Sequence, residues 1–156
     1  PLASICRARL ADLQNSLPVK RKAPTIPRRQ AVAAVIRNPE GLLLVVQRPA
    51  TGLLASLWKL PGGFVEDGEN MESSLKRNVR KELGIFIRPV KKLASVNHAY
   101  THFRVKLDPY ESILLKGEPK ALGCQEWRWA TLSDLNKLPL SKIDRMVIAV
   151  LSSLSR

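Results

Sequence analysis

Side chains that can hydrogen-bond a ligand are concentrated in one short segment, which contains His98, Tyr100, Thr101 and His102. Two histidines four residues apart can share a metal ion on a helix. On a β-strand they lie about 13 Å apart, which is too far for one ion. The Thr101 hydroxyl can both donate and accept a hydrogen bond. In an extended conformation, this segment therefore offers hydrogen bonds rather than a metal site.

The cysteines and the overall composition limit the class of protein. Cys6 and Cys124 do not form a disulfide framework, and this usage suits a reducing compartment. A chain of 156 residues with 45% apolar residues suits one globular domain. Charged residues at 25% exclude wholesale disorder. No apolar run approaches the roughly 20 residues that a membrane span needs, and the first residue, Pro1, suggests a processed product or an excised piece.

The charge balance points to a polyanionic partner. Lysine and arginine number 26 against 13 acidic residues, which gives a net charge of +13. Residues 1–29 hold seven basic side chains and one acid, Asp12, so the remaining chain is basic in its own right. Such an excess favours nucleic acid or an acidic membrane surface as the partner.

Hydrophobic periodicity and turn residues predict an α+β domain with a mixed sheet. We expect a short helix at 3–16, an extended basic and proline-rich linker at 17–29, and a hairpin of strands at 31–36 and 42–48. A long loop should follow at 49–63. Asn70 and Gly84 delimit a helix at 70–84, and Ser141 caps a last helix. Further strands are predicted at 92–98, 102–107, 110–115 and 126–130.

The segment from Gly62 to Ile85 resembles the Nudix box, a glycine- and glutamate-containing motif with fixed spacing. Seven of its positions are matched, namely Gly63, Glu69, Arg77, Val79, Glu82, Gly84 and Ile85. The resemblance implies a Nudix-like α/β/α sandwich. It also implies a helix that supplies three carboxylates to a divalent metal, with which Nudix hydrolases cut a diphosphate.

The three positions that correspond to those carboxylates hold Asn78, Lys81 and Glu82. Hard divalent cations need several oxygen ligands. An ammonium about 4 Å from a dication is repelled by several kcal/mol, even at an effective dielectric constant near 20. The sequence therefore predicts a Nudix fold whose metal site has degenerated, and we interpret Glu66, Glu69, Glu72 and Glu82 as solvated residues of the helix and the preceding turn.

Three further segments resemble the C-terminal domain of MutY-type adenine DNA glycosylases. The segment Arg48–Gly63 is similar to that family's Gly-Leu-Leu-Ala-any-Leu-Trp loop, with Leu60 in place of an aromatic residue. Val96–Tyr110 is similar to its His-any-Phe-Ser-His segment, and Trp127–Leu151 is similar to its closing pattern. The resemblance implies an 8-oxoguanine recognition domain at 30–156, which acts as part of an enzyme that removes adenine mispaired with 8-oxoguanine.

The N-terminal residues fit the same family, whose catalytic domain ends in an iron–sulfur motif. If cysteine precedes Pro1, Cys6 would be the fourth ligand of a 4Fe-4S cluster in the intact protein, whereas this fragment alone would hold no cofactor. Residues 1–16 would then end the cluster loop of a missing N-terminal glycosylase domain, joined by the linker 17–29. That domain carries the family's base-excising carboxylates, so no residue of this chain is predicted to be catalytic.

The resemblance assigns Thr101 to the oxidised edge of 8-oxoguanine, flanked by Tyr100 and His102. The expected partners are duplex DNA with an 8-oxoguanine:adenine pair and the glycosylase domain, in the bacterial cytoplasm at the nucleoid and not at a membrane. Two alternatives remain open, a weakly active Nudix hydrolase of nucleoside diphosphate-type substrates and a protein-interaction adaptor. Candidate phosphate contacts are Arg48, Lys142, Lys20, Arg21, Lys22, Arg28, Arg29 and Arg145.

Overall fold

The computed structural model describes residues 26–154, which form two β-sheets and three helices. The larger sheet has the order β4-β1-β7-β5, with β6 paired to β7, and the smaller one has the order β3-β2-β8. The strands are β1 (Arg28–Ile36), β2 (Leu43–Gln47), β3 (Trp58–Lys59), β4 (Gly62–Phe64), β5 (Phe86–Lys92), β6 (Val96–Ala99), β7 (Arg104–Lys116) and β8 (Glu126–Ala130); the helices are α2 (Met71–Leu83), α3 (Leu132–Lys137) and α4 (Lys142–Leu154).

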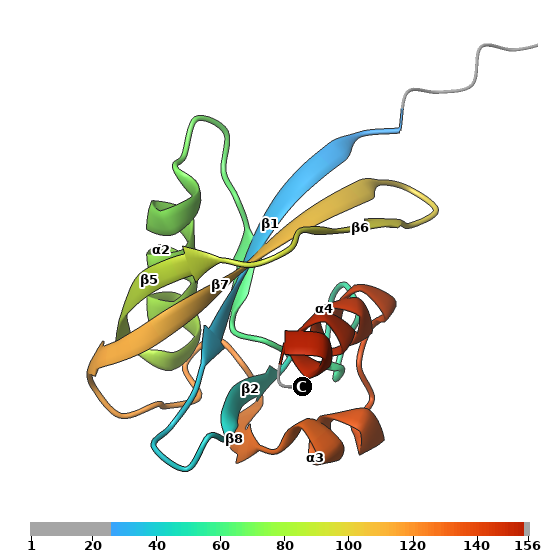
Figure 1. Cartoon of the computed structure of the whole chain (residues 1–156). Coiled ribbons are helices and arrows are strands. Elements are labelled where there is room, and N and C mark those ends of the chain that lie inside the picture. Colours follow the sequence, from blue (N-terminus) through green and yellow to red (C-terminus); the bar gives the residue numbers. More distant parts are fainter. Residues whose placement is uncertain (1–25, 155–156) are drawn as a thin grey trace, which may run out of the picture.

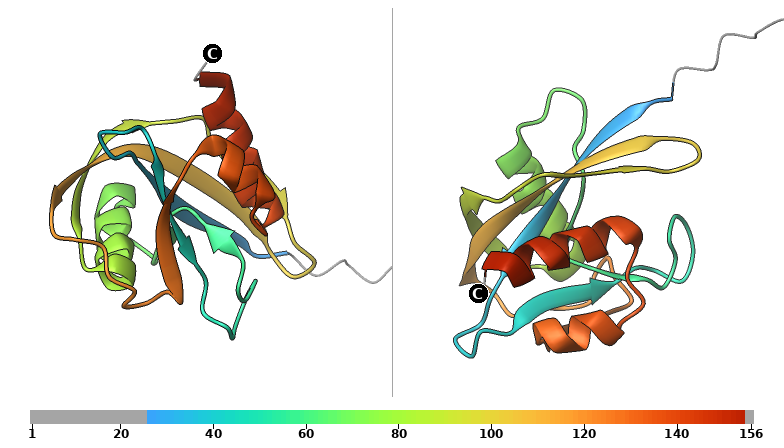
Figure 2. Two further views of the ribbon diagram at one scale, coloured as in Figure 1. Left: turned by 90° about the horizontal axis from the view of Figure 1, so that it is seen from below. Right: turned by 45° about the vertical axis from the view of Figure 1, so that its right-hand side comes forward.

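Strand β1 lies at the centre of the domain and is buried on both faces along its second half. Ala31, Ala33 and Val35 face a core that includes residues of α4. The alternate residues, such as Val32 and Ile36, face a second core under α2. Two helices thus cover opposite faces of the mixed sheet (Figures 1 and 2), which confirms the predicted sandwich.

Helix α2 has the boundaries that its sequence predicts. Asn70 Oδ1 accepts a hydrogen bond from the Glu72 N–H (2.8 Å), which caps the first turn. Gly84 ends the helix in a left-handed conformation with φ of 70°, which favours glycine. Leu75 and Val79 are buried on the face that packs against the sheet. Glu72, Lys76 and Arg80, on the other side of the helix, are exposed.

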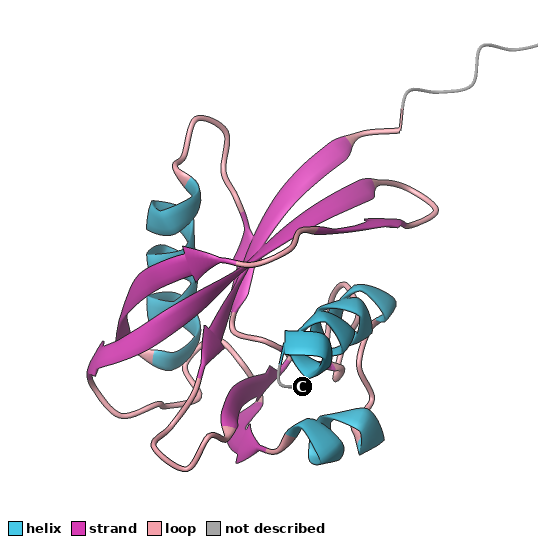
Figure 3. Ribbon diagram, viewed as in Figure 1, coloured by secondary structure: helices cyan, strands magenta, loops and turns pink. Residues whose placement is uncertain are grey.

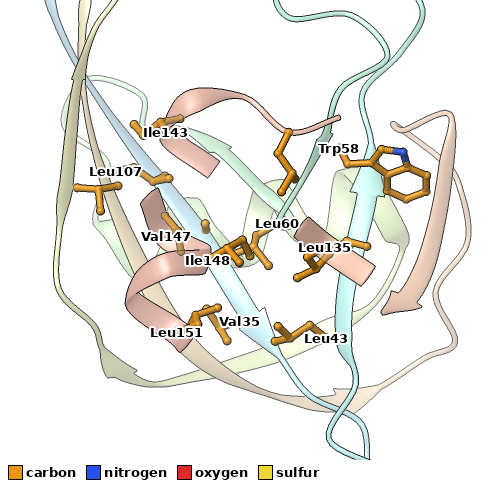
Figure 4. Packing of buried hydrophobic residues seen from close by; sticks show 14 of the residues in the cluster. Val35, Leu43, Trp58, Leu60, Leu107, Leu135, Ile143, Val147, Ile148 and Leu151 are labelled. Atoms are coloured by element: carbon orange, nitrogen blue, oxygen red, sulfur yellow. The ribbon is translucent and has the colours of Figure 1, made fainter. Parts of the chain in front are cut away.

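Helix α4 closes the other core. The Ser141 hydroxyl accepts from the Asp144 N–H (3.3 Å) at its start, as predicted. Figure 4 shows Ile143, Val147 and Leu151 of α4 packed in one cluster with Leu107 of the large sheet. The short α3, preceded by a Thr131–Asp134 capping box, was not predicted as a helix.

The predicted hairpin of residues 31–36 and 42–48 is wrong. The two strands lie in different sheets and share only an isolated bridge between Arg37 and Leu43. Strand β1 pairs instead with β7 in parallel and with β4 in antiparallel orientation. A strand that is apolar on both faces belongs in the interior of a sheet, where long-range neighbours cover both edges.

Three other predictions about the strands also differ from the structure. The segment 49–63 is not a continuous loop, because it contains β3 and the start of β4. The strands predicted at 102–107 and 110–115 form one strand, β7, which passes through Pro109. Pro109 lacks the N–H that a strand residue donates, but its carbonyl still accepts a hydrogen bond from the Leu93 N–H (2.8 Å). The strand predicted at 92–98 is divided between β5 and β6.

The N-terminal predictions fall largely outside the described residues. Outside the described residues lie the helix predicted at 3–16, Cys6 and most of the linker 17–29. Strand β1 begins at Arg28, so the last two linker residues belong to the sheet. In Figure 3 the start of β1 and the β6–β7 hairpin extend side by side away from α2, whereas α4 lies beside β6.

Candidate functional site

Glu82, the one acidic residue at the three predicted metal-ligand positions, is bound by partners within the protein. The prediction that Glu82 and Glu69 are solvated is wrong, because their side chains are only 15% and 18% exposed and each pairs with a basic residue. Lys59 Nζ lies 2.5 Å from Glu82 Oε1, and the Gly62 N–H donates to Glu82 Oε2 (3.0 Å). Lys59 also donates to the Gly62 carbonyl (2.5 Å) and is only 6% exposed. Both carboxylate oxygens and the ammonium are therefore committed to one another and to the backbone of β4.

The other two metal-ligand positions offer no acid. Asn78 turns its amide nitrogen inward and donates to the Ser74 carbonyl (2.9 Å), while Lys81 is exposed on the same helix. Among residues 26–154 there is no cluster of three or more histidine, cysteine, aspartate or glutamate side chains able to hold a metal. The divalent metal that the Nudix fold implies thus does not fit the residues at this site.

The rest of the motif keeps a structural role. Arg77 Nε and Nη2 donate to the two carboxylate oxygens of Glu69, each at 2.8 Å. Arg77 Nη1 also lies 3.1 Å from Glu66 Oε1. The hydrogen bonds from Arg77 lower the pKa of Glu69 to about 2. This two-pronged contact ties the loop before α2 to the middle of the helix.

A small cavity of about 90 Å³ lies beside β1, lined by apolar side chains and by Arg48, Lys59, Tyr100 and Asp144. Arg48 Nη2 is 3.6 Å from Asp144 Oδ2. Burial raises the pKa of the Asp144 carboxyl, although Ser141 and Arg48 act in the opposite direction. Ligand pockets usually measure about 300–1,000 Å³. The cavity is therefore too small, in this conformation, to enclose a nucleotide.

The segment His98–His102 forms the end of the β6–β7 hairpin. The Tyr100 N–H donates to the Phe103 carbonyl (2.8 Å), which closes a turn with Thr101 and His102 at its tip. Both tip side chains are exposed. The Tyr100 ring stacks on Phe103, with ring centres 5.0 Å apart, and meets His98 edge to face. Thr101, the residue predicted to contact the oxidised base, therefore projects from a turn that is supported by packing of the Tyr100, Phe103 and His98 rings.

The predicted DNA contacts do not all lie together. Tyr100, Thr101 and His102 share the hairpin tip, and Lys142 is exposed at the start of α4. Arg48 has an internal carboxylate partner and lines the cavity, so we leave it out of the surface considered below. Lys59 is not among the residues predicted from the sequence, although a single lysine between the apolar residues Trp58 and Leu60 is a signal for a buried ion pair.

The fold and the retained positions of the Nudix box indicate a Nudix domain, and comparisons with known proteins agree. The NUDIX domain profile matches residues 32–150. A solved MutT protein from Methanosarcina mazei superposes with a TM-score of 0.77 and 25% identity, covering 86% of this chain and 99% of that one. The chain belongs to the Nudix family.

Two curated relatives differ in the function that their names state. Adenine DNA glycosylase of Rattus norvegicus is 29% identical over 83% of this chain, but the match spans only 27% of that protein. CTP pyrophosphohydrolase of Escherichia coli is 30% identical over 74% of this chain and 84% of its own length. Within residues 26–154, no helix is long and apolar enough to cross a membrane.

Proposed function

We propose that this chain is a non-hydrolytic Nudix domain that recognises 8-oxoguanine opposite adenine in duplex DNA, as one domain of an adenine DNA glycosylase. The observation that carries the proposal is the Lys59–Glu82 pair, which occupies the only acid at the metal-ligand positions. The similarity to the rat adenine DNA glycosylase supports the same function. The 4Fe-4S cluster at Cys6 and the N-terminal glycosylase domain belong to this proposal.

The chemistry of the lesion suits a hydroxyl at the hairpin tip. Guanine presents N7 and O6 as acceptors on its major-groove edge. Oxidation at C8 converts N7 into an N–H donor and adds a carbonyl oxygen. A threonine hydroxyl can accept from the new N–H or donate to the new oxygen. Thr101 is exposed and projects from the turn, so a base edge can approach it without rearrangement of the hairpin.

The Thr101→Val substitution tests this role, because valine keeps the shape and removes the hydroxyl. Loss of one hydrogen bond costs about 0.5–1.5 kcal/mol, so affinity for a duplex with 8-oxoguanine:adenine should fall a few-fold to roughly tenfold. Affinity for the matching guanine:adenine duplex should not change. Fluorescence anisotropy at one fixed salt concentration measures both.

The matched control is Thr51→Val, which removes another exposed threonine hydroxyl from the loop before β3. It should leave both affinities unchanged. Equal weakening of the two duplexes by Thr101→Val would show that Thr101 does not read the lesion. A lesion-specific loss in the Thr51 variant alone would place recognition on that loop instead.

The alternative function is hydrolysis of a nucleoside polyphosphate, and the similarity to CTP pyrophosphohydrolase favours it. Our proposal predicts no magnesium-dependent release of phosphate or pyrophosphate from CTP or 8-oxo-dGTP by the chain. The measurement is product release with magnesium and with excess chelator. Turnover that needs magnesium and is absent from a folded Glu82→Gln variant would establish the hydrolase and overturn the proposal.

A further inference from the structure

A basic face lies on the extended part of the large sheet, beyond the end of α2. Arg28 of β1 is the parallel partner of Arg104 in β7, and Gln30 is the partner of Lys106. Strand β6 continues the row, because Asn97 pairs with Lys106. Paired residues, and residues two apart on one strand, share a sheet face. Three cations and two amides therefore form one surface, which we call the basic face.

The basic face borders an open groove of about 570 Å³ whose lining residues include no carboxylate. Arg28, Arg104 and Lys106 are exposed, and none forms an ion pair within residues 26–154. The nearest acid along β7, Asp108, is buried and bound by Lys92 (2.9 Å) and Ser95 (2.5 Å), and it also attracts Lys106, with which it forms no direct ion pair. The basic charges of this face are thus turned toward solvent.

The pairing of Arg28 with Arg104 is unfavourable in the isolated domain, because like charges directly opposite each other destabilise a sheet. A bound anion converts this repulsion into a favourable interaction. The neighbouring Arg29 behaves differently. It lies on the other face, where its guanidinium packs 5.4 Å from the ring centres of both Phe64 and Phe103. The two faces of β1 therefore carry different arginines. Arg29 packs against aromatic rings, whereas Arg28 is available to a ligand.

We propose that the basic face binds the phosphodiester backbone of duplex DNA, beside the nucleotide that the hairpin tip contacts. Arginine, lysine, glutamine and asparagine side chains are common donors to phosphate oxygens. Arg104 lies on the same hairpin as Thr101, so a phosphate contact there would fix the register of the tip on the duplex. The position relative to the lesion rests on the proposed function, whereas the phosphate contact itself does not.

The test is a triple variant, Arg28→Gln, Arg104→Gln and Lys106→Gln, with binding of both duplexes measured over a series of salt concentrations. Each lost phosphate contact should reduce the slope of log affinity against log salt by about 0.9, so the triple change should reduce it by up to about three. Affinity should fall equally for the 8-oxoguanine:adenine and guanine:adenine duplexes, and their ratio should persist.

The control variant removes the same charge elsewhere, through Lys76→Gln, Arg88→Gln and Lys116→Gln. These exposed residues lie on α2, on β5 and at the far end of β7. The control should change the slope much less. If the two triple variants reduced the slope equally, DNA binding would depend on the total charge of the protein and not on the basic face, which would overturn the proposal.

The remaining outcomes separate this proposal from the proposed function. An unchanged slope, with a lesion-specific effect of Thr101→Val, would overturn the basic face and leave lesion recognition standing. A reduced slope without any Thr101 effect would support the basic face and count against lesion recognition. In the last outcome, the triple variant of the basic face binds duplex DNA as well as the parent but binds vesicles that contain phosphatidylserine more weakly than the parent. That result would identify a membrane surface as the partner and overturn the proposal.

Discussion

Replacing Glu82 by leucine is expected to destabilise the domain by about 3 kcal/mol, or roughly 10 °C in the midpoint of thermal unfolding. The substitution leaves the Lys59 ammonium buried without its counter-charge, and the Lys59 side chain is only 7% exposed. Removal of one partner from a buried ion pair usually costs about 3–5 kcal/mol. We choose the low end because the Glu82 side chain retains 15% exposure.

The double variant Lys59→Met with Glu82→Leu distinguishes a lost charge from a lost shape. Without either charge, most of the stability should return, because apolar replacement of a buried pair is often neutral. Urea unfolding of the parent, the two single variants and the double variant gives the coupling energy directly. If Glu82→Leu alone is as stable as the parent, the pair does not neutralise a buried charge, and our account of the lost metal site fails.

The second large effect concerns Gly62, where alanine should cost about 3–5 kcal/mol. Gly62 has a φ of 144°, a conformation that side chains with a Cβ atom rarely adopt. An added Cβ atom would lie 2.1 Å from the Val32 carbonyl oxygen of the adjacent strand. Backbone strain and overpacking each cost about 1–3 kcal/mol. The clash involves the backbone of β1, so rotation of a side chain cannot relieve it.

Gly63→Ala is the matched control, one residue away in the same strand. Its added Cβ would meet the Asn78 side-chain oxygen at 2.5 Å, and that amide can rotate away at the expense of its hydrogen bonds. Gly63 has no positive φ, so only the contact has to be relieved. We expect a smaller loss of stability than for Gly62→Ala, measured by urea unfolding. Equal losses would mean that contact with α2, rather than the backbone of β4, determines the requirement for glycine.

These predictions share one physical basis, which is that the Nudix motif has kept its structural residues and lost its metal ligands. Gly62, which directly precedes the motif's Gly63, allows β4 to approach β1, and within the motif Arg77 holds Glu69. Glu82 remains acidic, but its charge is matched by a lysine from the same chain rather than by a metal ion. This arrangement is consistent with the non-hydrolytic function that we propose.

The sequence alone determined the features that depend on local order. The stripe containing Leu75 and Val79, together with Asn70 and Gly84, defined α2, and Ser141 defined the start of α4. The absence of acids at Asn78 and Lys81 is directly readable, because the motif has fixed spacing. These signals lie within a few helical turns, where periodicity and capping chemistry suffice.

The tertiary structure decided the contacts between distant segments. It placed Lys59 against Glu82, aligned Arg28 with Arg104, and joined two predicted strands through Pro109 into β7. It also separated β1 from β2, which adjacency in sequence suggested would pair. The two faces of β1 are buried in the α2 and α4 cores, and β4 and β7 pair along its two edges. Strand propensity does not select the partners, because the Gly-Gly-Phe strand β4 pairs with β1 whereas the more strand-favouring β2 does not, so the packing of the whole domain selects among them.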